Sequence, residues 1–353
     1  MSNFKKHIPF LAAVLMVVSG LGLTIYRNNT EPEQYKKIYI DAFDTVTQVI
    51  GYAESEEEFT KQAATINAAL VHYNDLYDIY SIREDVNNLR TVNMNAGKEP
   101  VKVDREIIDL LKFSIDLYKK TNGEVNIAMG SVLKIWHNYR TDGIDNPSTA
   151  TLPPMDKLQE AMKHTNIDDI IIDEEASTVY LADPEMSLDV GSIGKGYAVQ
   201  KVAEYARELG YYNLVINCGG NVISIGPKSG EKDWVFGIQN PDLEAKNDII
   251  QRVAITDKCL VTSGDYQRYY VVDGIEYCHI IDPDTLMPPT YFSAVSIICD
   301  DSGLADALST ALFNMPYEEG LALINSMNNA EAIWVFKDGS IKYSENFEDY
   351  IVK

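Results

Sequence analysis

The sequence predicts a mixed α/β protein of the α+β class. Segments such as 105–120 place apolar residues three and four positions apart, which is the spacing of an amphipathic helix. Segments such as 38–52 alternate and are rich in β-branched residues, as half-buried strands are. The two kinds of segment are interspersed without the regular strand–helix–strand period of a parallel sheet. An apolar content of 46% argues against disorder.

Helices are expected where apolar residues recur with the helical period. In 105–120 the apolar stripe is formed by Ile108, Leu111 and Ile115, and Thr121-Asn122-Gly123 ends the helix. The expected helices are 56–80, 105–120, 155–164, 197–209 and 303–315.

Strands are expected in short apolar or alternating runs bounded by turn residues. Segment 269–281 is predicted to be a hairpin because Asp273-Gly274 is a strong turn dipeptide. The other expected strands or strand pairs are 38–52, 170–181, 187–190, 214–218, 222–225, 234–238, 252–256, 294–299, 333–336 and 341–343.

The N-terminus predicts the location of the protein. A short basic stub, 1–7, carries Lys5 and Lys6, and an apolar run over 8–26 follows it. The run reaches membrane-spanning length and also resembles a secretory signal, and we favour an uncleaved anchor over a cleaved signal or a buried core helix. The two lysines favour a cytoplasmic N-terminus, with 27–36 as a linker and the remainder outside the cell membrane.

The formal net charge of −23 and the lack of a visible basic patch argue against a nucleic-acid-binding protein. Acidity of this kind usually serves solubility. An anionic substrate would be repelled by such a surface, so a metal ion or a local Lys or Arg would have to offset the repulsion. The four cysteines lack zinc-site spacing, and a disulfide between two of them stays open.

A glycine-rich run, Asp189 to Gly196, leaves one predicted strand and enters a predicted helix. Glycines at such a place let the backbone approach an anion, and the helix N-terminus offers free N–H groups. Lys195 adds a positive charge. The run matches neither GxGxxG nor a Walker loop, so a phosphate site and a simple tight turn remain equally open.

Asp306 and Thr310 are four residues apart, which places them on one face of a helix. One carboxylate and one hydroxyl form a partial Mg²⁺ shell that backbone carbonyls, water and substrate phosphates can complete. From spacing alone, a solvated polar face is the more common explanation.

His279 is the histidine, among five, that has strand-like apolar neighbours and a nearby acid. It is a candidate general base, and a structural histidine is equally open. Ser263 lacks a Gly-x-Ser-x-Gly elbow, which disfavours a serine hydrolase. Gly219-Gly220-Asn221 lies between two strands and is either a hairpin turn or a point of close approach to a ligand.

The order and spacing of these motifs resemble the FAD:protein FMN transferases, the ApbE family. The resemblance covers residues 39–315 and rests on eight segments: Ala42-Phe43-Asp44-Thr45, Asp78-Ile79-Tyr80, Gly123-Glu124-Val125-Asn126, Asp189 to Gly196, Gly219 to Asn221, Ser263 to Tyr266, His279 to Pro283, and Ala305 to Thr310. It implies a T-fold-like, ApbE-type catalytic domain over 37–353.

The sequence departs from the family pattern at three places. Asp44 and Leu286 stand where the family usually has Gly, and Asn126 stands where Asp is usual. These departures predict altered loops near the flavin. The metal residues are kept.

The resemblance implies Mg²⁺-dependent transfer of FMN from FAD, the substrate, to a Thr or Ser hydroxyl of an extracytoplasmic acceptor protein, with release of AMP. Mg²⁺ would be held by Asp306, Thr310 and a carbonyl at Ser192, and His279 would take the proton. FAD hydrolysis to FMN and AMP, and flavin binding without catalysis, are the alternatives. The residues implied to contact FAD are Phe43, Tyr80, Glu124, Val125, Asn126, Asp189, Lys195, Gly219, Gly220 and Ile281.

Overall fold

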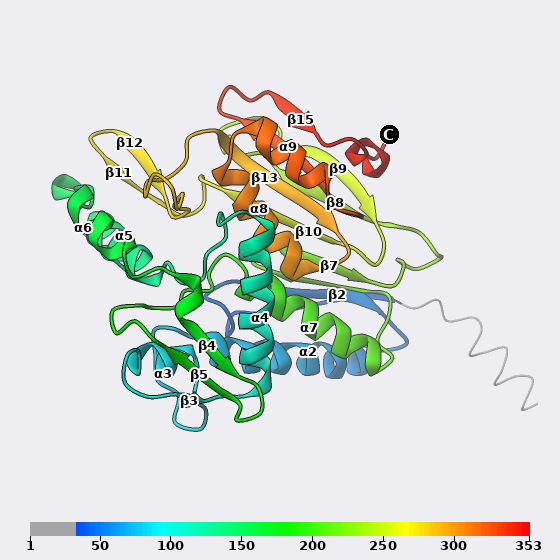
Figure 1. Ribbon diagram of the computed structural model, residues 1–353. Helices are drawn as coiled ribbons and strands as arrows, with labels where there is room; N and C mark the ends of the chain where they lie inside the picture. The colour runs from blue at the N-terminus through cyan, green and yellow to red at the C-terminus, as the bar shows by residue number, and fades with distance from the viewer. Residues whose placement is uncertain (1–32) are drawn as a thin grey trace, which may run out of the picture.

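A computed structural model describes residues 33–353, and an eight-stranded antiparallel sheet lies at its centre (Figure 1). The strand order is β1-β2-β6-β7-β10-β13-β14-β15. The strands are β1 (Glu33–Tyr39), β2 (Thr47–Ala53), β6 (Leu214–Cys218), β7 (Asn221–Ile225), β10 (Cys259–Gly264), β13 (Phe292–Cys299), β14 (Glu331–Phe336) and β15 (Ile341–Tyr343).

Helices α2 (Glu56–Tyr77), α7 (Gly194–Glu208) and α8 (Ser302–Asn314), with α9 (Tyr317–Asn325) over β14, cover one face of this sheet, and a small strand pair covers part of the other. Helix α7 packs between α2 and α8, as Figure 1 shows. On the opposite face, β8 (Trp234–Gln239), β9 (Ile249–Ile255) and the 3₁₀ turn Phe347–Tyr350 enclose a separate core. Alternation along β13 divides the two cores, because Val295 and Ile297 face α8 while Ile298 faces β9.

The rest of the chain forms two smaller layers beside the sheet. Strands β3 (Val101–Lys102), β5 (Thr178–Leu181) and β4 (Ile170–Asp173) make one, next to α3 (Leu89–Met94) and α4 (Arg105–Lys120). Helices α5 (Gly130–Asp145) and α6 (Met155–Met162) make the other with the hairpin of β11 (Tyr269–Val272) and β12 (Ile275–Cys278). Short 3₁₀ turns lie at Pro147–Thr149 and Ile167–Asp169, and α9 (Tyr317–Asn325) follows α8.

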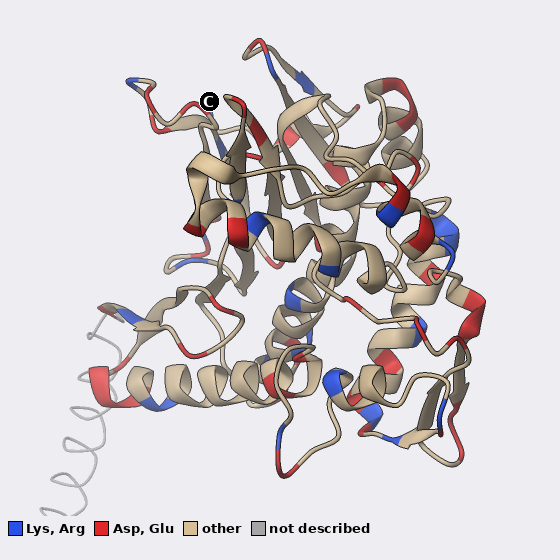
Figure 2. Cartoon of the chain, turned by 90° about the vertical axis from the view of Figure 1, so that its left-hand side faces the viewer, with Lys and Arg blue, Asp and Glu red and all other residues tan. Residues whose placement is uncertain are grey.

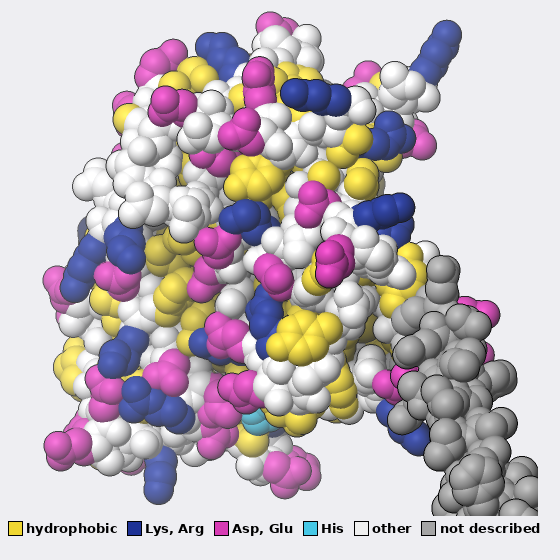
Figure 3. Space-filling view, turned by 90° about the vertical axis from the view of Figure 1, so that its right-hand side faces the viewer, with side chains coloured by type: hydrophobic (Ala, Val, Ile, Leu, Met, Phe, Trp, Pro, Cys, Tyr) yellow, Lys and Arg dark blue, Asp and Glu magenta, His cyan; other side chains and the backbone are white. Residues whose placement is uncertain are grey.

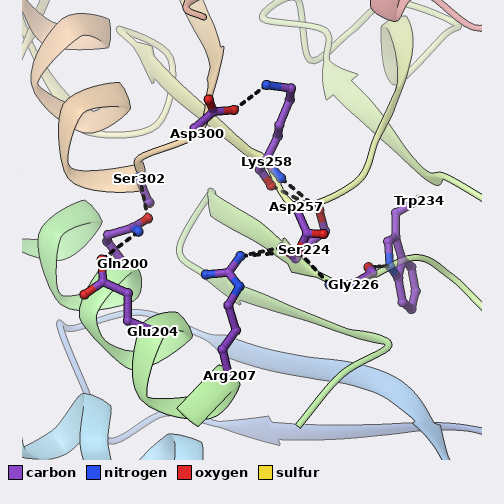
Figure 4. A network of polar contacts seen from close by, with 10 residues as sticks. All are labelled: Gln200, Glu204, Arg207, Ser224, Gly226, Trp234, Asp257, Lys258, Asp300 and Ser302. Atoms are coloured by element: carbon purple, nitrogen blue, oxygen red, sulfur yellow. Dashed lines mark hydrogen bonds and ion pairs between the residues drawn. The ribbon is translucent and has the colours of Figure 1, made fainter. Parts of the chain in front are cut away.

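Polar contacts fasten α7 to the sheet and to the start of α8 (Figure 4). The side chain of Gln200 accepts a hydrogen bond from the Ser302 backbone N–H at 3.0 Å. Arg207, in the last turn of α7, pairs with Asp257 at 3.5 Å, and Asp257 also accepts from the N–H of Gly226 at 2.8 Å. These contacts fix the position of α7 relative to α8, which matters for the site described below.

The mixed α/β prediction is confirmed, and most expected elements are present. Helices α3, α5 and α9 and strands β3 and β10 were not expected. The predicted strand 187–190 is wrong, because only an isolated bridge between Met129 and Ser187 forms there. Residues 33–36, expected to be linker, are part of β1. Helix α7 begins at Gly194, so the end of the glycine-rich run is already helical.

The surface of the described residues mixes both signs of charge. Figure 2 shows acidic residues at many loops and helix ends with Lys and Arg between them, and Figure 3 shows the same mixture with small apolar areas on another face. The four cysteines are free and buried. Among residues 33–353, no helix is long and apolar enough to cross a membrane. The predicted basic stub, the 8–26 membrane segment and most of the linker lie outside the described residues.

Candidate active site

A cavity of about 510 Å³ opens where α5, α7, α8 and the loops at the ends of the central strands meet. It collects nearly all of the residues that the sequence singled out, although they come from elements far apart in the chain. The predicted residues in its wall are Tyr80, Glu124, Asn126, Asp189, Ser192, Lys195, Gly219, Gly220, His279, Ile281, Asp306 and Thr310.

The first turn of α7 is joined directly to α8 at the cavity. The N–H of Gly196 donates to Oδ2 of Asp306 at 2.7 Å. A Cβ at Gly196 would overlap the Ser302 carbonyl and the Asp306 side chain, so only glycine permits this approach. Lys195 donates to Oδ1 of Asn221 and lies 4.0 Å from Oδ1 of Asp306. Asp306 is 6% exposed, so the solvated-face explanation of the Asp306–Thr310 spacing is wrong.

The oxygens around Asp306 and Thr310 fit a hard divalent cation such as Mg²⁺. Oδ1 of Asp306 accepts no hydrogen bond within the described chain, and the Thr310 hydroxyl has only a 3.5 Å contact, to Ser263. Ser192 lies in the same cavity wall. This site differs from a cluster of metal-binding side chains, because residues 33–353 contain no group of three or more His, Cys, Asp or Glu that could hold a metal ion. One carboxylate with hydroxyl and carbonyl oxygens suits Mg²⁺, which keeps waters and binds substrate phosphates.

Hydroxyl contacts hold the Thr310 side of the cavity in place. The Ser263 hydroxyl, from β10, lies 2.8 Å from that of Ser309, which in turn donates to the Asp306 carbonyl at 2.9 Å. Ser263 therefore links β10 to α8. Ser263 thereby helps to hold α8 in place. A structural role of this kind agrees with the lack of a serine-hydrolase elbow in the sequence.

His279 follows β12 and faces the cavity. Its backbone N–H donates to the Arg268 carbonyl at 3.0 Å, while its Nδ1 is buried and has no hydrogen-bond partner within residues 33–353. Burial, together with the positive charges of Arg140 and Arg268, lowers the pKa of His279 from 6.5 to about 4. The imidazole is therefore neutral near pH 7 and can accept a proton.

Glu124 and Asn126 lie at the entry to α5 and do different things. Asn126 donates to the Thr165 carbonyl at 3.0 Å and accepts from the Ala128 N–H at 2.9 Å, so an amide suits this place better than the usual carboxylate. Oε2 of Glu124 is buried without a partner among the described residues. Burial, reinforced by the charge of Asp282, raises the pKa of Glu124 from 4.5 to about 7.

Asp189 stabilises the turn that precedes α7. Its Oδ1 accepts from the Gly191 N–H at 2.8 Å, and burial raises its pKa. At the β6–β7 turn, Gly219 has φ 54° and a Cβ there would overlap Thr45. The Gly219-Gly220 turn is thus a hairpin turn that also forms part of the cavity wall, and its close approach to a ligand stays a prediction.

Two residues implied to contact FAD lie elsewhere. Phe43 packs against the main core, and its backbone N–H donates to Asn74 Oδ1 at 2.8 Å. Val125 is 1% exposed and belongs to the same core. Neither lines the cavity. Two departures from the family pattern have a backbone consequence, because Asp44 and Leu286 take φ values of 49° and 61°, the region that favours glycine.

The cavity also contains residues that the sequence analysis missed, chiefly His137 and Arg140 on α5. The Tyr80 ring packs on His137 with centroids 5.5 Å apart, and Arg140 contacts His137 Nδ1 at 3.2 Å. Helix α5 escaped detection because its buried residues are few and widely spaced, since part of its surface lines the cavity. The available sequence signal for this helix was the four-residue spacing of Trp136 and Arg140, which places both side chains on one helix face. The described buried residues of α5 are Gly130, Val132, Trp136 and Gly143.

Comparison with known proteins identifies the family of this chain. The sequence profile of the ApbE family matches residues 43–334. An FAD:protein FMN transferase of Treponema pallidum is 31% identical over 309 residues, covering 82% of this chain and 83% of that protein. One from Vibrio cholerae is 28% identical over 293 residues, covering 82% and 84%.

Solved structures share the fold. The ApbE protein of Thermotoga maritima superposes with a TM-score of 0.79 at 28% identity, covering 91% of this chain and all of that one. The flavin transferase ApbE of Vibrio cholerae gives 0.75 at 24% identity, with coverages of 90% and 99%. The family resemblance expected from the motifs is thereby confirmed, and this chain belongs to the ApbE family.

Proposed function

We propose that this chain is a transferase that moves FMN from FAD to a Ser or Thr hydroxyl of another protein and releases AMP, with Mg²⁺. The observation that carries the proposal is the gathering of Asp306, Thr310 and His279 in one cavity. Relatives described as FAD:protein FMN transferases align with most of the chain, which supports the same chemistry here.

The metal-binding part of the proposal assigns Mg²⁺ to the Asp306 carboxylate, the Thr310 hydroxyl and a carbonyl of the Gly191–Ser192 turn. Bound there, the ion would neutralise phosphate charge. The protein's own contribution is to hold these oxygens still. Gly196 fixes one carboxylate oxygen of Asp306, and Ser263 and Ser309 hold the hydroxyl side.

The base in the proposal is His279. The acceptor oxygen forms a bond to the FMN-side phosphorus, the bond from that phosphorus to the AMP oxygen breaks, and the hydroxyl proton passes to the imidazole. The imidazole is neutral near pH 7 and its Nδ1 has no hydrogen-bond partner among residues 33–353, so this nitrogen is free to accept the proton. A pKa of about 4 makes it a weak base, and phosphate charge bound beside it would raise that pKa. Proton removal contributes on the order of 10²–10⁴-fold, so positioning and charge neutralisation account for the larger share.

The test uses the full-length chain with FAD, Mg²⁺ and a secreted flavoprotein as acceptor. Mass spectrometry should show that the acceptor gains one FMN, and AMP release should depend on the acceptor. Rapid AMP release without acceptor, and no mass gain with it, would identify an FAD hydrolase instead. Flavin binding without either product would identify a non-catalytic flavin-binding protein.

The location is a further part of the proposal. We infer that residues 8–26 anchor the chain in the cell membrane and that the catalytic domain lies outside it, on the side of its acceptor. The apolar run after Lys5 and Lys6 supports this, and the first strand that the structure describes, β1, starts at Glu33, a few residues after the run. Protease added to intact cells should digest the domain, and the chain should sediment with membranes. Recovery in the cytosol would contradict the assignment.

A further inference from the structure

Two guanidinium groups reach the cavity from separate elements. Arg140 is on α5, one turn after Trp136, and Arg268 is in the loop between β10 and β11. The Trp136 indole donates to the Leu286 carbonyl at 2.9 Å, which fixes the orientation of α5. Arg268 donates to the Asp44 carbonyl at 3.3 Å. Different parts of the fold thus direct both cations to one place.

Neither guanidinium has a carboxylate within ion-pair distance among residues 33–353, whereas Arg83, Arg105 and Arg207 each do. Arg90 and Arg252 also form no ion pair within this range, but they do not line the cavity. Arg140 is only partly exposed, and burial, with the charge of Arg268 nearby, lowers its pKa. An arginine nevertheless stays charged. The Asp189 carboxylate in the same cavity wall offsets part of this positive charge but forms no ion pair with either arginine. Two like charges side by side remain unfavourable unless an anion binds between them.

The other cation in the cavity wall is already engaged. Lys195 donates to Asn221 and lies beside Asp306. The protein as a whole carries a formal charge of −23, which repels anionic ligands at long range. Within residues 33–353 the side-chain contacts of the two arginines are to His137 Nδ1, from Arg140, and to the Asp44 carbonyl, from Arg268, and each uses one guanidinium nitrogen. Both therefore keep donors for a phosphate-bearing ligand, and a guanidinium fork matches phosphate oxygens in geometry.

We propose that Arg140 and Arg268 form a clamp for the diphosphate of FAD and for the phosphate of the departing AMP. The proposal rests on the proposed function and adds the residues that hold the leaving group. It separates two tasks, because the Asp306 and Thr310 oxygens serve the metal while the arginines on the α5 side take the remaining phosphate charge. His279 lies close enough to both arginines for their charges to affect it.

The test measures binding rather than turnover. Full-length Arg140→Gln and Arg268→Gln chains are compared with wild type for affinity to FAD, AMP and riboflavin, without Mg²⁺. A charge-assisted contact to phosphate should make FAD and AMP binding at least about 10-fold weaker in each variant. Riboflavin, which has no phosphate, should bind as before. Arg140→Lys should recover part of the affinity because it keeps the charge but loses the fork.

The control is Arg105→Gln, because Arg105 pairs with Asp109 and Glu174 on the surface, away from the cavity. It should leave all three affinities unchanged. The dependence of AMP affinity on salt concentration should also become less steep in Arg140→Gln and Arg268→Gln. Thermal melting checks that both are folded, and Arg268 is exposed, so its replacement leaves the core intact.

Two results would overturn the clamp. If riboflavin and FAD lose affinity equally, the arginines contact the flavin ring rather than phosphate. If AMP binds normally to both variants, they hold only the protein's own loops. This test does not depend on acceptor labelling. The wild-type protein could fail to label any acceptor, and the Arg140→Gln variant could still bind AMP more weakly than wild type. The proposed function would then fail while the clamp stands.

Discussion

The backbone N–H of Gly196 donates to Oδ2 of Asp306 at 2.7 Å, across 110 residues of sequence. This contact joins the first turn of α7 to α8 and sets the position of the carboxylate assigned to the metal. It depends on the missing side chain of Gly196, whose Cβ would overlap α8.

Gly196→Ala should therefore destabilise the fold and move Asp306. Overpacking of this kind costs about 1–3 kcal/mol, which a thermal or urea unfolding curve can measure. Gly194→Ala is the matched comparison, because its Cβ would meet side chains and no backbone atom, with Val190 Cγ2 nearest at 3.0 Å and Tyr77 Cδ2 at 3.8 Å. Equal stability of Gly196→Ala and wild type would show that the two helices can separate freely.

Replacing Asp306 by Asn should separate its two roles. An amide oxygen can still accept from Gly196, so the unfolding temperature should stay near that of wild type. The loss of the negative charge should abolish most Mg²⁺ affinity and with it the transfer of FMN. Isothermal titration with Mg²⁺ and the acceptor mass gain are the measurements. Normal transfer at limiting Mg²⁺ would remove Asp306 from the metal site.

His279→Ala should abolish acceptor labelling while FAD binding persists, because no contact with flavin is assigned to the imidazole. In the wild type, a pKa of about 4 keeps His279 neutral down to mildly acidic pH. Protonation of His279 should therefore lower kcat/KM only when the pH falls to about 4. Labelling at the normal rate by His279→Ala would exclude it as the base.

Arg140→Gln should raise the pKa of His279. Burial is the main cause of the low pKa and remains, but the removal of one nearby positive charge favours the imidazolium. An NMR titration of the His279 ring in both proteins measures the change. An unaltered pKa would mean that Arg140 points away from His279 in solution.

Glu124→Gln should make the stability of the protein less dependent on pH. The pKa of Glu124 rises from 4.5 to about 7 on folding, so its contribution is complete below pH 4.5 and is lost as pH rises through about 7. The variant should match wild type near pH 4 and unfold at a higher temperature near pH 8. Identical melting curves at pH 8 would show that Glu124 ionises freely in the folded state.

The glycines that the family usually has at 44 and 286 should have opposite effects here. A non-glycine residue with positive φ costs about 1–2 kcal/mol, less for Asp. Asp44 is exposed, so Asp44→Gly should stabilise the protein, with a gain in the free energy of unfolding below about 1 kcal/mol. Leu286 is 5% exposed, and losing a buried leucine costs about 2–5 kcal/mol. Leu286→Gly should therefore destabilise the protein. Unfolding curves of the two variants and of wild type measure both changes in stability.

Much of the fold was predictable because its signals are local. Helices α2, α4 and α8 carry apolar residues at helical spacing over many turns, and the β11–β12 hairpin has its Asp273-Gly274 turn. Helix α5 gave a weak signal, because a helix that lines a cavity buries less of a continuous stripe. The expected strand at 187–190 failed because an apolar run can pass through a core without a partner strand.

The sequence by itself determined the chemical groups of the site and the family. Residues such as Asp189 to Gly196, His279, Asp306 and Thr310 occur in motifs whose order is readable without coordinates. Tertiary structure alone decided how those groups behave. It buried Asp306 and Val125, packed Phe43 against the core and brought the charge of Arg140 near His279, whose Nδ1 has no partner in the described part of the chain. The reason is physical: solvation and charge at each group depend on neighbours more than a hundred residues away in sequence.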